Sequence, residues 1–166
     1  MGVFLAFPII FILVLLQTTL VNQLTLLSGC ADLVLLWIVA WSLQKQVRHA
    51  WLWVILAGIS VAFVSAIPWY VPVICYAGAA YLAKLVNQRV WQSPILMMFM
   101  VTIVSSIFIN VFTFVSLVVQ GVNIGFQTGL VQVIIPSTLI NLLLALPVYA
   151  VAKDTAQWLY PVEVTE

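Results

Sequence analysis

The stretch AWLWVILAGISVAFVSAIPWYVPVICYAGAAYLA, residues 50–83, is 34 residues long and contains no charged side chain. A single helix crosses the apolar core of a bilayer with about 20 residues, so this stretch is too long for one span. It is just long enough for two short spans, and Pro68 is expected to break the helix between them because proline removes a backbone donor. The stretch therefore predicts two membrane-spanning helices, at residues 50–66 and 69–83.

The whole chain shares this apolar character. Of its 166 residues, 66% are hydrophobic and 5% are charged, whereas about 25% of the residues of a typical soluble domain carry a charge. The chain has 5 lysines and arginines and 4 acids, which are too few to make the surface of a soluble protein polar. It is also too apolar to be a disordered chain. The net charge of +1 leaves no basic face for nucleic acid. The composition favours an integral membrane protein with helical spans.

Apolar runs between the charged residues predict a single domain of six transmembrane helices. The expected spans are residues 2–21, 30–44, 50–66, 69–83, 93–119 and 130–152. Residues 45–49 and 84–89 are expected to form basic loops, and residues 153–166 a short cytoplasmic tail. All lysines and arginines follow the second, fourth or sixth span, so the positive-inside rule puts both termini in the cytoplasm. The first span lacks a basic leader and a cleavage site, so we expect it to be retained.

Tryptophans lie near several of the expected loops. Trp41, Trp51, Trp53 and Trp91 flank the basic loops, and Trp69 lies at the opposite boundary. Because an indole ring can be buried while its N–H reaches the headgroups, we interpret these residues as an interfacial aromatic belt.

Few residues are available for catalysis or metal binding. Cys30 and Cys75 lack the close spacing of a metal pair, and His49 is the only histidine. With 4 acids in the chain, no phosphate loop, carboxylate pair or nucleophile–base set can be assembled. We therefore expect no enzyme, no cofactor and no metal site.

Asp32 is the one acid near the membrane outside the tail. A buried, ionised carboxylate in a membrane marks a partner or a functional site. A carboxylate in the first turn of a helix can instead accept the free backbone N–H groups as a cap. The sequence leaves both roles open.

Uncharged polar residues fall on single faces of the last two spans. They are Thr102, Ser106, Asn110 and Thr113 in the fifth span, and Ser137 and Asn141 in the sixth. Such groups need partners inside lipid, so these faces are expected to turn toward other helices. They form interhelical hydrogen bonds or line a pocket that receives a ligand or a partner helix.

Two prolines bracket Asn141 in the last span. Pro136 and Pro147 are each expected to kink the helix and open a groove on one side of it. Small residues in the fourth span, between residues 77 and 83, allow another backbone to approach closely.

Four short motifs lie near the two ends of the chain. Residues 17–20 (QTTL) close the first span, and residues 31–36 (ADLVLL) open the second. The last span contains residues 136–141 (PSTLIN) and 145–149 (ALPVY). Together these motifs resemble MreD, a family of rod-shape-determining membrane proteins of bacteria. Length, six spans and short cytoplasmic ends agree, so the resemblance covers nearly the whole chain.

The resemblance implies a non-enzymatic scaffold in the bacterial inner membrane. MreD is similar in topology to the substrate-binding S components of energy-coupling-factor vitamin transporters, and it is thought to bind the bitopic protein MreC. Further implied partners are MreB, RodA and a penicillin-binding transpeptidase. Membrane lipid and a second copy of the chain are candidate partners of any chain with so little mass outside the bilayer. The candidate partner-binding or pocket residues are Gln17, Asp32, Ser106, Asn110, Pro136, Asn141 and Pro147.

Two other functions remain open from the sequence. A transporter S component is also a six-helix bundle of about this length, and it requires a pocket with several hydrogen-bonding side chains. The absence of basic residues from the outer connections argues against an anionic vitamin as its substrate. A pore or an accessory subunit of another membrane complex is the third function class.

Overall fold

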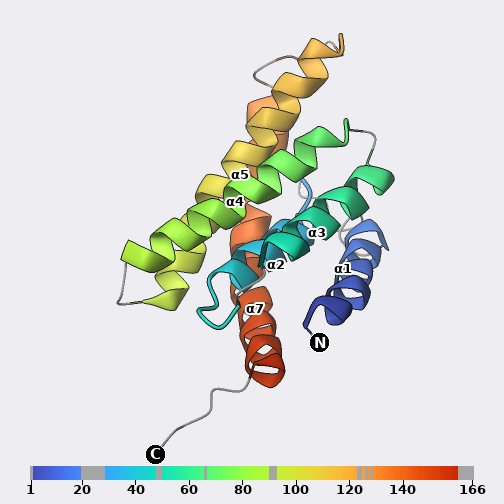
Figure 1. Cartoon of the computed structure of the whole chain (residues 1–166). Coiled ribbons are helices and arrows are strands. Elements are labelled where there is room, and N and C mark those ends of the chain that lie inside the picture. The colour runs from blue at the N-terminus through green and yellow to red at the C-terminus, as the bar shows by residue number, and fades with distance from the viewer. Residues whose placement is uncertain are drawn as a thin grey trace, which may run out of the picture.

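The computed structural model describes residues 2–19, 29–47, 50–65, 67–89, 93–122, 125, 127 and 129–160. Helices account for most of these residues, and no strand occurs among them (Figure 1). In chain order, the described elements are α1 (Gly2–Thr19), α2 (Leu33–Ser42), α3 (Ala50–Val64), α4 (Tyr70–Arg89), α5 (Pro94–Val119), the π-helical segment η2 (Gly129–Ile134) and α7 (Ile135–Leu159). One α-helix overlaps each of the six apolar segments, which confirms the all-helical prediction for this part of the chain. Leu20, His49, Trp91 and residues 161–166 lie outside the described residues.

Two helical stretches are long and apolar enough to cross a membrane. They are α5, with 26 residues, and Val131–Leu159, with 29 residues. At about 1.5 Å per residue α5 is about 39 Å long, which exceeds the roughly 30 Å apolar core of a bilayer. α2, α3 and most of α1 are apolar but shorter. By length and composition, the two long stretches indicate association with a membrane.

Large apolar side chains lie exposed along the outward faces of the helices. Phe63 is 87% exposed and Leu143 is 74% exposed. On α5 and α7 the exposed residues recur at helical spacing, as in Val104, Val111, Val115, Leu139, Leu143 and Leu146. Proteins that are monomeric in water rarely expose such continuous apolar patches. These faces are suited to lipid or to another helix.

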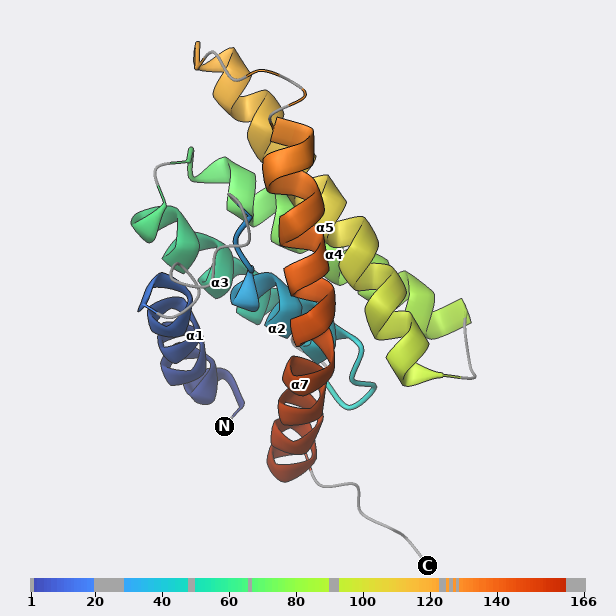
Figure 2. The ribbon, with the colours of Figure 1, turned by 180° about the vertical axis from the view of Figure 1, so that it is seen from behind.

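The two ends of the bundle carry different parts of the chain. Figures 1 and 2 show the N-terminus, the end of α4, the start of α5 and the end of α7 at one end. The end of α3, the start of α4 and the end of α5 lie at the opposite end. Lys45, Lys84 and Lys153, which are exposed, belong to the segment after α2 and to the last parts of α4 and α7.

Two helices extend beyond the spans expected from charge. α4 continues to Arg89, so the prediction of a basic loop at residues 84–89 is wrong. This segment has no glycine or proline to end the helix, and basic side chains are favourable near the negative end of the helix dipole. α7 likewise continues past Lys153 and Asp154 to Leu159. Charge therefore located the ends of the apolar segments, but it did not locate the ends of the helices.

The predicted break at Pro68 is confirmed. α3 ends at Val64 and α4 begins at Tyr70, with a short turn between them. The two helices then pack closely, because a Cβ atom added to Gly58 of α3 would lie 2.9 Å from the backbone Cα of Val73 in α4. Any larger residue at position 58 would push the two helices apart.

α2 is the central helix of the bundle, and it is only 10 residues long. Residues 34–42 are all buried, and the helix contacts α1, α3, α4, α5 and α7. Its length of about 15 Å is half the thickness of the bilayer core. α2 therefore fills only part of the depth of the bundle, and its first turn begins in the interior (Figures 1 and 2).

Three tryptophans form a cluster between α2 and α3. The ring of Trp41 stacks on Trp37 at a centroid distance of 5.9 Å and lies 4.4 Å from the ring of Trp53. Trp41 is 0% exposed and Trp53 is 1% exposed, so the predicted interfacial position is wrong for both. The surrounding helices enclose α2 on all sides, and Trp53 lies on the buried face of α3. Trp51 and Trp69 are exposed, as an aromatic belt requires.

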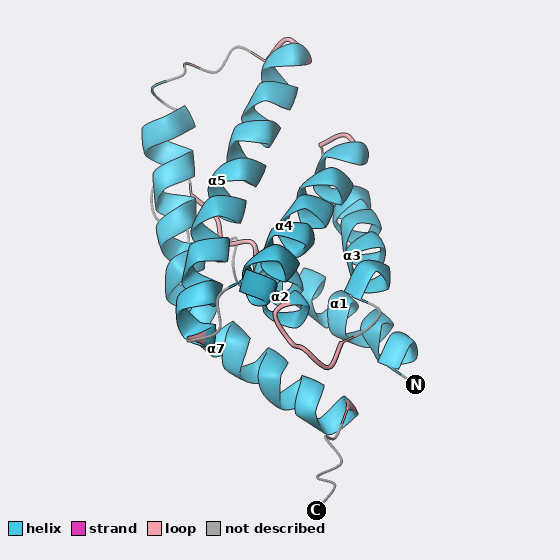
Figure 3. Cartoon of the chain, turned by 60° about the vertical axis from the view of Figure 1, so that its left-hand side comes forward, coloured by secondary structure: helices cyan, strands magenta, loops and turns pink. Residues whose placement is uncertain are grey.

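α7 is bent along its length (Figure 3). Pro147 lies inside the helix and is one of the residues that bend helices, because it removes a backbone donor. Pro136 lies in the first turn of α7, directly after η2, where a missing N–H is tolerated.

We predict that Trp53→Ala lowers the free energy of unfolding by about 3–5 kcal/mol, because it removes a buried ring from the tryptophan cluster. Trp51→Ala, two residues away on the exposed face of α3, is the matched control and is expected to change stability by no more than about 0.5 kcal/mol. Unfolding by denaturant in mixed micelles measures both variants. Equal stability of the two variants would contradict the packing described for α2 and α3.

Candidate functional site

Asp32 is the N-cap residue of α2. Its Oδ1 accepts a hydrogen bond from the backbone N–H of Leu35 at 2.9 Å. The first N–H groups of a helix have no partner within the helix, and a carboxylate in this position satisfies one of them. Of the two roles left open for Asp32, the structure establishes the capping role.

Tyr76 of α4 holds the same carboxylate from the other side. Its hydroxyl donates to Asp32 Oδ1 at 3.1 Å and to Oδ2 at 3.0 Å. The Tyr76 side chain is buried. The sequence offered no signal for this contact, since a tyrosine in an apolar segment also suits an interfacial position.

Asn141 of α7 connects α2 with α5. Its Oδ1 accepts from the backbone N–H of Asp32 at 2.8 Å, and its Nδ2 donates to Ser106 Oγ at 3.0 Å. One turn earlier, Ser137 Oγ accepts from the backbone N–H of Cys30 at 3.1 Å. The polar face predicted for the last span therefore turns toward the segment that leads into α2.

Gln17 of α1 completes the set. Its Oε1 accepts from the backbone N–H of Val34 at 3.3 Å. Side chains from α1, α5 and α7, with Tyr76 of α4, thus surround the start of α2. We call this set the polar hub; it consists of Gln17, Asp32, Tyr76, Ser106, Ser137 and Asn141.

Gly29 allows the chain to reach the hub. A Cβ atom at this position would lie 2.6 Å from Pro136 Cβ and 2.6 Å from the Ser137 backbone nitrogen. Only glycine fits against α7 here without displacing the backbone. This contact gives Pro136 a packing role beside the hub.

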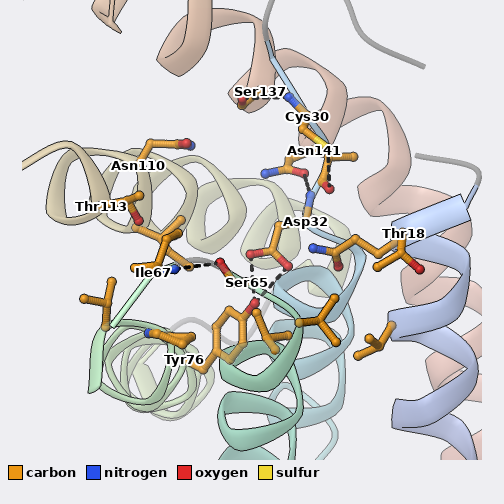
Figure 4. A pocket seen from close by; sticks show the side chains of 18 of the residues that line it. Thr18, Cys30, Asp32, Ser65, Ile67, Tyr76, Asn110, Thr113, Ser137 and Asn141 are labelled. Carbon is orange, nitrogen blue, oxygen red and sulfur yellow. Dashed lines mark hydrogen bonds between the residues drawn. The ribbon is translucent and has the colours of Figure 1, made fainter. Parts of the chain in front are cut away.

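A cavity of about 340 Å³ lies next to the hub. Figure 4 shows side chains from several elements around this space, with Asp32 and Tyr76 on one side and Asn110 and Thr113 on another. Its apolar walls come from α1, α3, α4, α5 and η2. They include Val14, Val61, Val64, Val71, Ile109 and Val133. The lining residues of the α3–α4 turn, Ser65 and Ile67, lie at the end of the bundle opposite the N-terminus.

The structure brings most of the predicted site residues together. Gln17, Asp32, Ser106 and Asn141 belong to the hub. Asn110 lines the cavity, but its Nδ2 donates to the backbone carbonyl of Ser106 in its own helix at 2.8 Å. Pro136 packs against Gly29, and Pro147 is exposed on α7 outside the cavity lining.

The site is suited to binding. Within the described part of the chain, no group of three or more histidine, cysteine or acidic residues is placed to hold a metal ion. The lining combines one carboxyl group with neutral amides and hydroxyls. Such a set can hold a cation or a hydrogen-bond donor.

Comparison with known proteins gives no family assignment. No protein-family model matches the chain, and no curated protein or solved structure shows a significant match.

We predict that Asn141→Leu destabilises the protein by about 1–3 kcal/mol, because it leaves the Asp32 N–H and the Ser106 hydroxyl without their partner. Asn110→Leu is the control, since it loses one bond within a helix and is expected to cost less than about 1 kcal/mol. Unfolding in mixed micelles distinguishes the two. If Asn110→Leu were the more damaging variant, the hub would not be the structural centre described above.

Proposed function

We propose that the chain is a six-span membrane scaffold of the MreD type that holds MreC within the bilayer. The observation that carries this proposal is the polar hub. Three of the four segments that resemble MreD, residues 17–20, 31–36 and 136–141, supply Gln17, Asp32, Ser137 and Asn141 to one connected set. The resemblance therefore concerns residues that meet in space, although they come from opposite ends of the sequence.

The arrangement of the helix ends supports six spans with both termini in the cytoplasm. The described lysines belong to segments that end on the same side of the bundle as the N-terminus. Positive residues gather on the cytoplasmic side of bacterial inner-membrane proteins. This assignment puts the cavity toward the periplasmic half of the membrane.

The exposed apolar helix faces support a partner that is met within the bilayer. Transmembrane helices associate through close packing, which small residues and bent helices favour. Ala77 of α4 and Ala150 of α7 are exposed small residues, and α7 is bent. These faces are available to the transmembrane helix of MreC or to a second copy of the chain. MreB, RodA and the transpeptidase are the wider partners of such a scaffold.

We predict that a tryptophan on one of the exposed faces of α4, α5 or α7 reduces the amount of MreC that co-purifies with the tagged protein in mild detergent. The variants are Ala77→Trp in α4, Val111→Trp in α5 and Ala150→Trp in α7, each at an exposed position. At least one should lower recovery tenfold or more, which corresponds to about 1.4 kcal/mol, and should disturb rod shape. Gln157→Trp, near the end of α7, is the control. Unchanged recovery and shape in all three variants would count decisively against the scaffold.

The cavity also favours a second function, the substrate-binding S component of an energy-coupling-factor transporter. Its volume of about 340 Å³ and its hydrogen-bonding side chains are suited to a small ligand. The same purification discriminates between the two functions. A stoichiometric small molecule with ATPase subunits, and no bitopic partner, would support transport.

A further inference from the structure

We propose that the cavity beside the polar hub binds an organic cation with a primary ammonium group, and that Asp32 is its counter-ion. This site goes beyond the scaffold function and does not depend on it. Three features of the cavity carry the proposal: its charge, its volume and the distribution of its polar groups.

The charge of the lining selects a cation. Among the described residues that line the cavity, Asp32 is the only acid, and there is no lysine, arginine or histidine. The groups that hold the Asp32 carboxylate are neutral: the Leu35 N–H and the Tyr76 hydroxyl. An ionised carboxylate in such a place is costly without a compensating charge. A cationic ligand would compensate it, whereas an anion would find no partner.

The volume selects an organic cation over a bare metal ion. A metal ion needs several oxygen ligands within about 2.0–2.6 Å. The lining supplies one carboxylate, and the cavity that it borders has a volume of about 340 Å³. At roughly 30 Å³ for each water-sized atom, this volume holds about ten non-hydrogen atoms. The ligand is therefore a small molecule, or the end of a larger one.

The polar groups match an ammonium group that carries a carbon body. An ammonium has three donors and no acceptor, and the Asp32 carboxylate is the charged acceptor in the lining. Asn110 and Thr113 lie on another side of the cavity, where their oxygen atoms can accept from a polar group elsewhere on the ligand (Figure 4). The aliphatic side chains of α3 and α4, Val61, Val64 and Val71, form an apolar wall for the carbon atoms. Two sources share this chemistry: the headgroup of an aminophospholipid and a soluble amine.

The test uses the full chain in nanodiscs that contain equal amounts of phosphatidylethanolamine and phosphatidylglycerol. Native mass spectrometry of the released protein should show about tenfold preferential retention of one phosphatidylethanolamine molecule. In nanodiscs of phosphatidylglycerol alone, added ethanolamine is the second probe. Retention of the lipid without ethanolamine binding identifies the aminophospholipid, and ethanolamine binding identifies a soluble amine.

Asp32→Asn separates ligand binding from folding. Asparagine caps helices about as well as aspartate, and its amide oxygen can accept from Leu35 and Tyr76, so the variant should fold while it loses the ligand. Asp154→Asn, which removes an exposed acid near the end of α7, should retain it. Unfolding midpoints verify that both variants are folded. Equal retention of the two lipids together with no ethanolamine binding, or a ligand kept by folded Asp32→Asn, would overturn the proposal.

Discussion

The hydrogen bond from the Asp32 backbone amide to Asn141 is the contact on which the remaining arrangement depends. A helix that begins inside an apolar bundle has no water for its first N–H groups, so other helices must supply acceptors. α2 is in this position because it is only 10 residues long and is enclosed by the other described α-helices, α1, α3, α4, α5 and α7. Gln17, Ser137 and Asn141 supply the acceptors, and Asp32 caps the helix from within. The polar faces of α1 and α7 therefore follow from the length of α2.

The short α2 also has a consequence for binding. Residues 29–32 lead into the first turn of α2, and the cavity lies beside this segment. The residues that cap α2 thus line a space in which one carboxyl group faces neutral polar groups. A scaffold built in this way has exposed helix faces for a partner within the bilayer and, separately, a cavity for a small ligand. Occupancy of the cavity would bear directly on the hub, because Asp32 belongs to both.

Much of the fold could be predicted from the sequence, because long apolar runs and Pro68 mark the helices directly. Gln17, Asp32, Ser106 and Asn141 could be predicted as site residues, since a polar side chain in an apolar helix needs a partner. Tyr76 could not, because its ring suits an apolar segment and its hydroxyl gives no indication of a partner 44 positions away in the chain. Trp41 and Trp53 were misplaced for a related reason: distance from a basic loop along the chain does not determine which face of a helix is buried. The end of α4 was missed because lysine and arginine do not terminate helices.

The central claim, that segments near both ends of the chain meet at the start of α2, can be tested by a disulfide between Cys30 and Ser137→Cys. The background carries Cys75→Ala and a protease site inserted after Gly121, and Thr138→Cys is the neighbouring control. Because Cys30 N lies 3.1 Å from Ser137 Oγ, mild oxidation in membranes should link the two thiols. After cleavage, the halves of the Ser137→Cys chain should migrate together until reductant is added, whereas those of Thr138→Cys should separate. Separation of the halves in Ser137→Cys, with both thiols open to alkylation, would contradict the account.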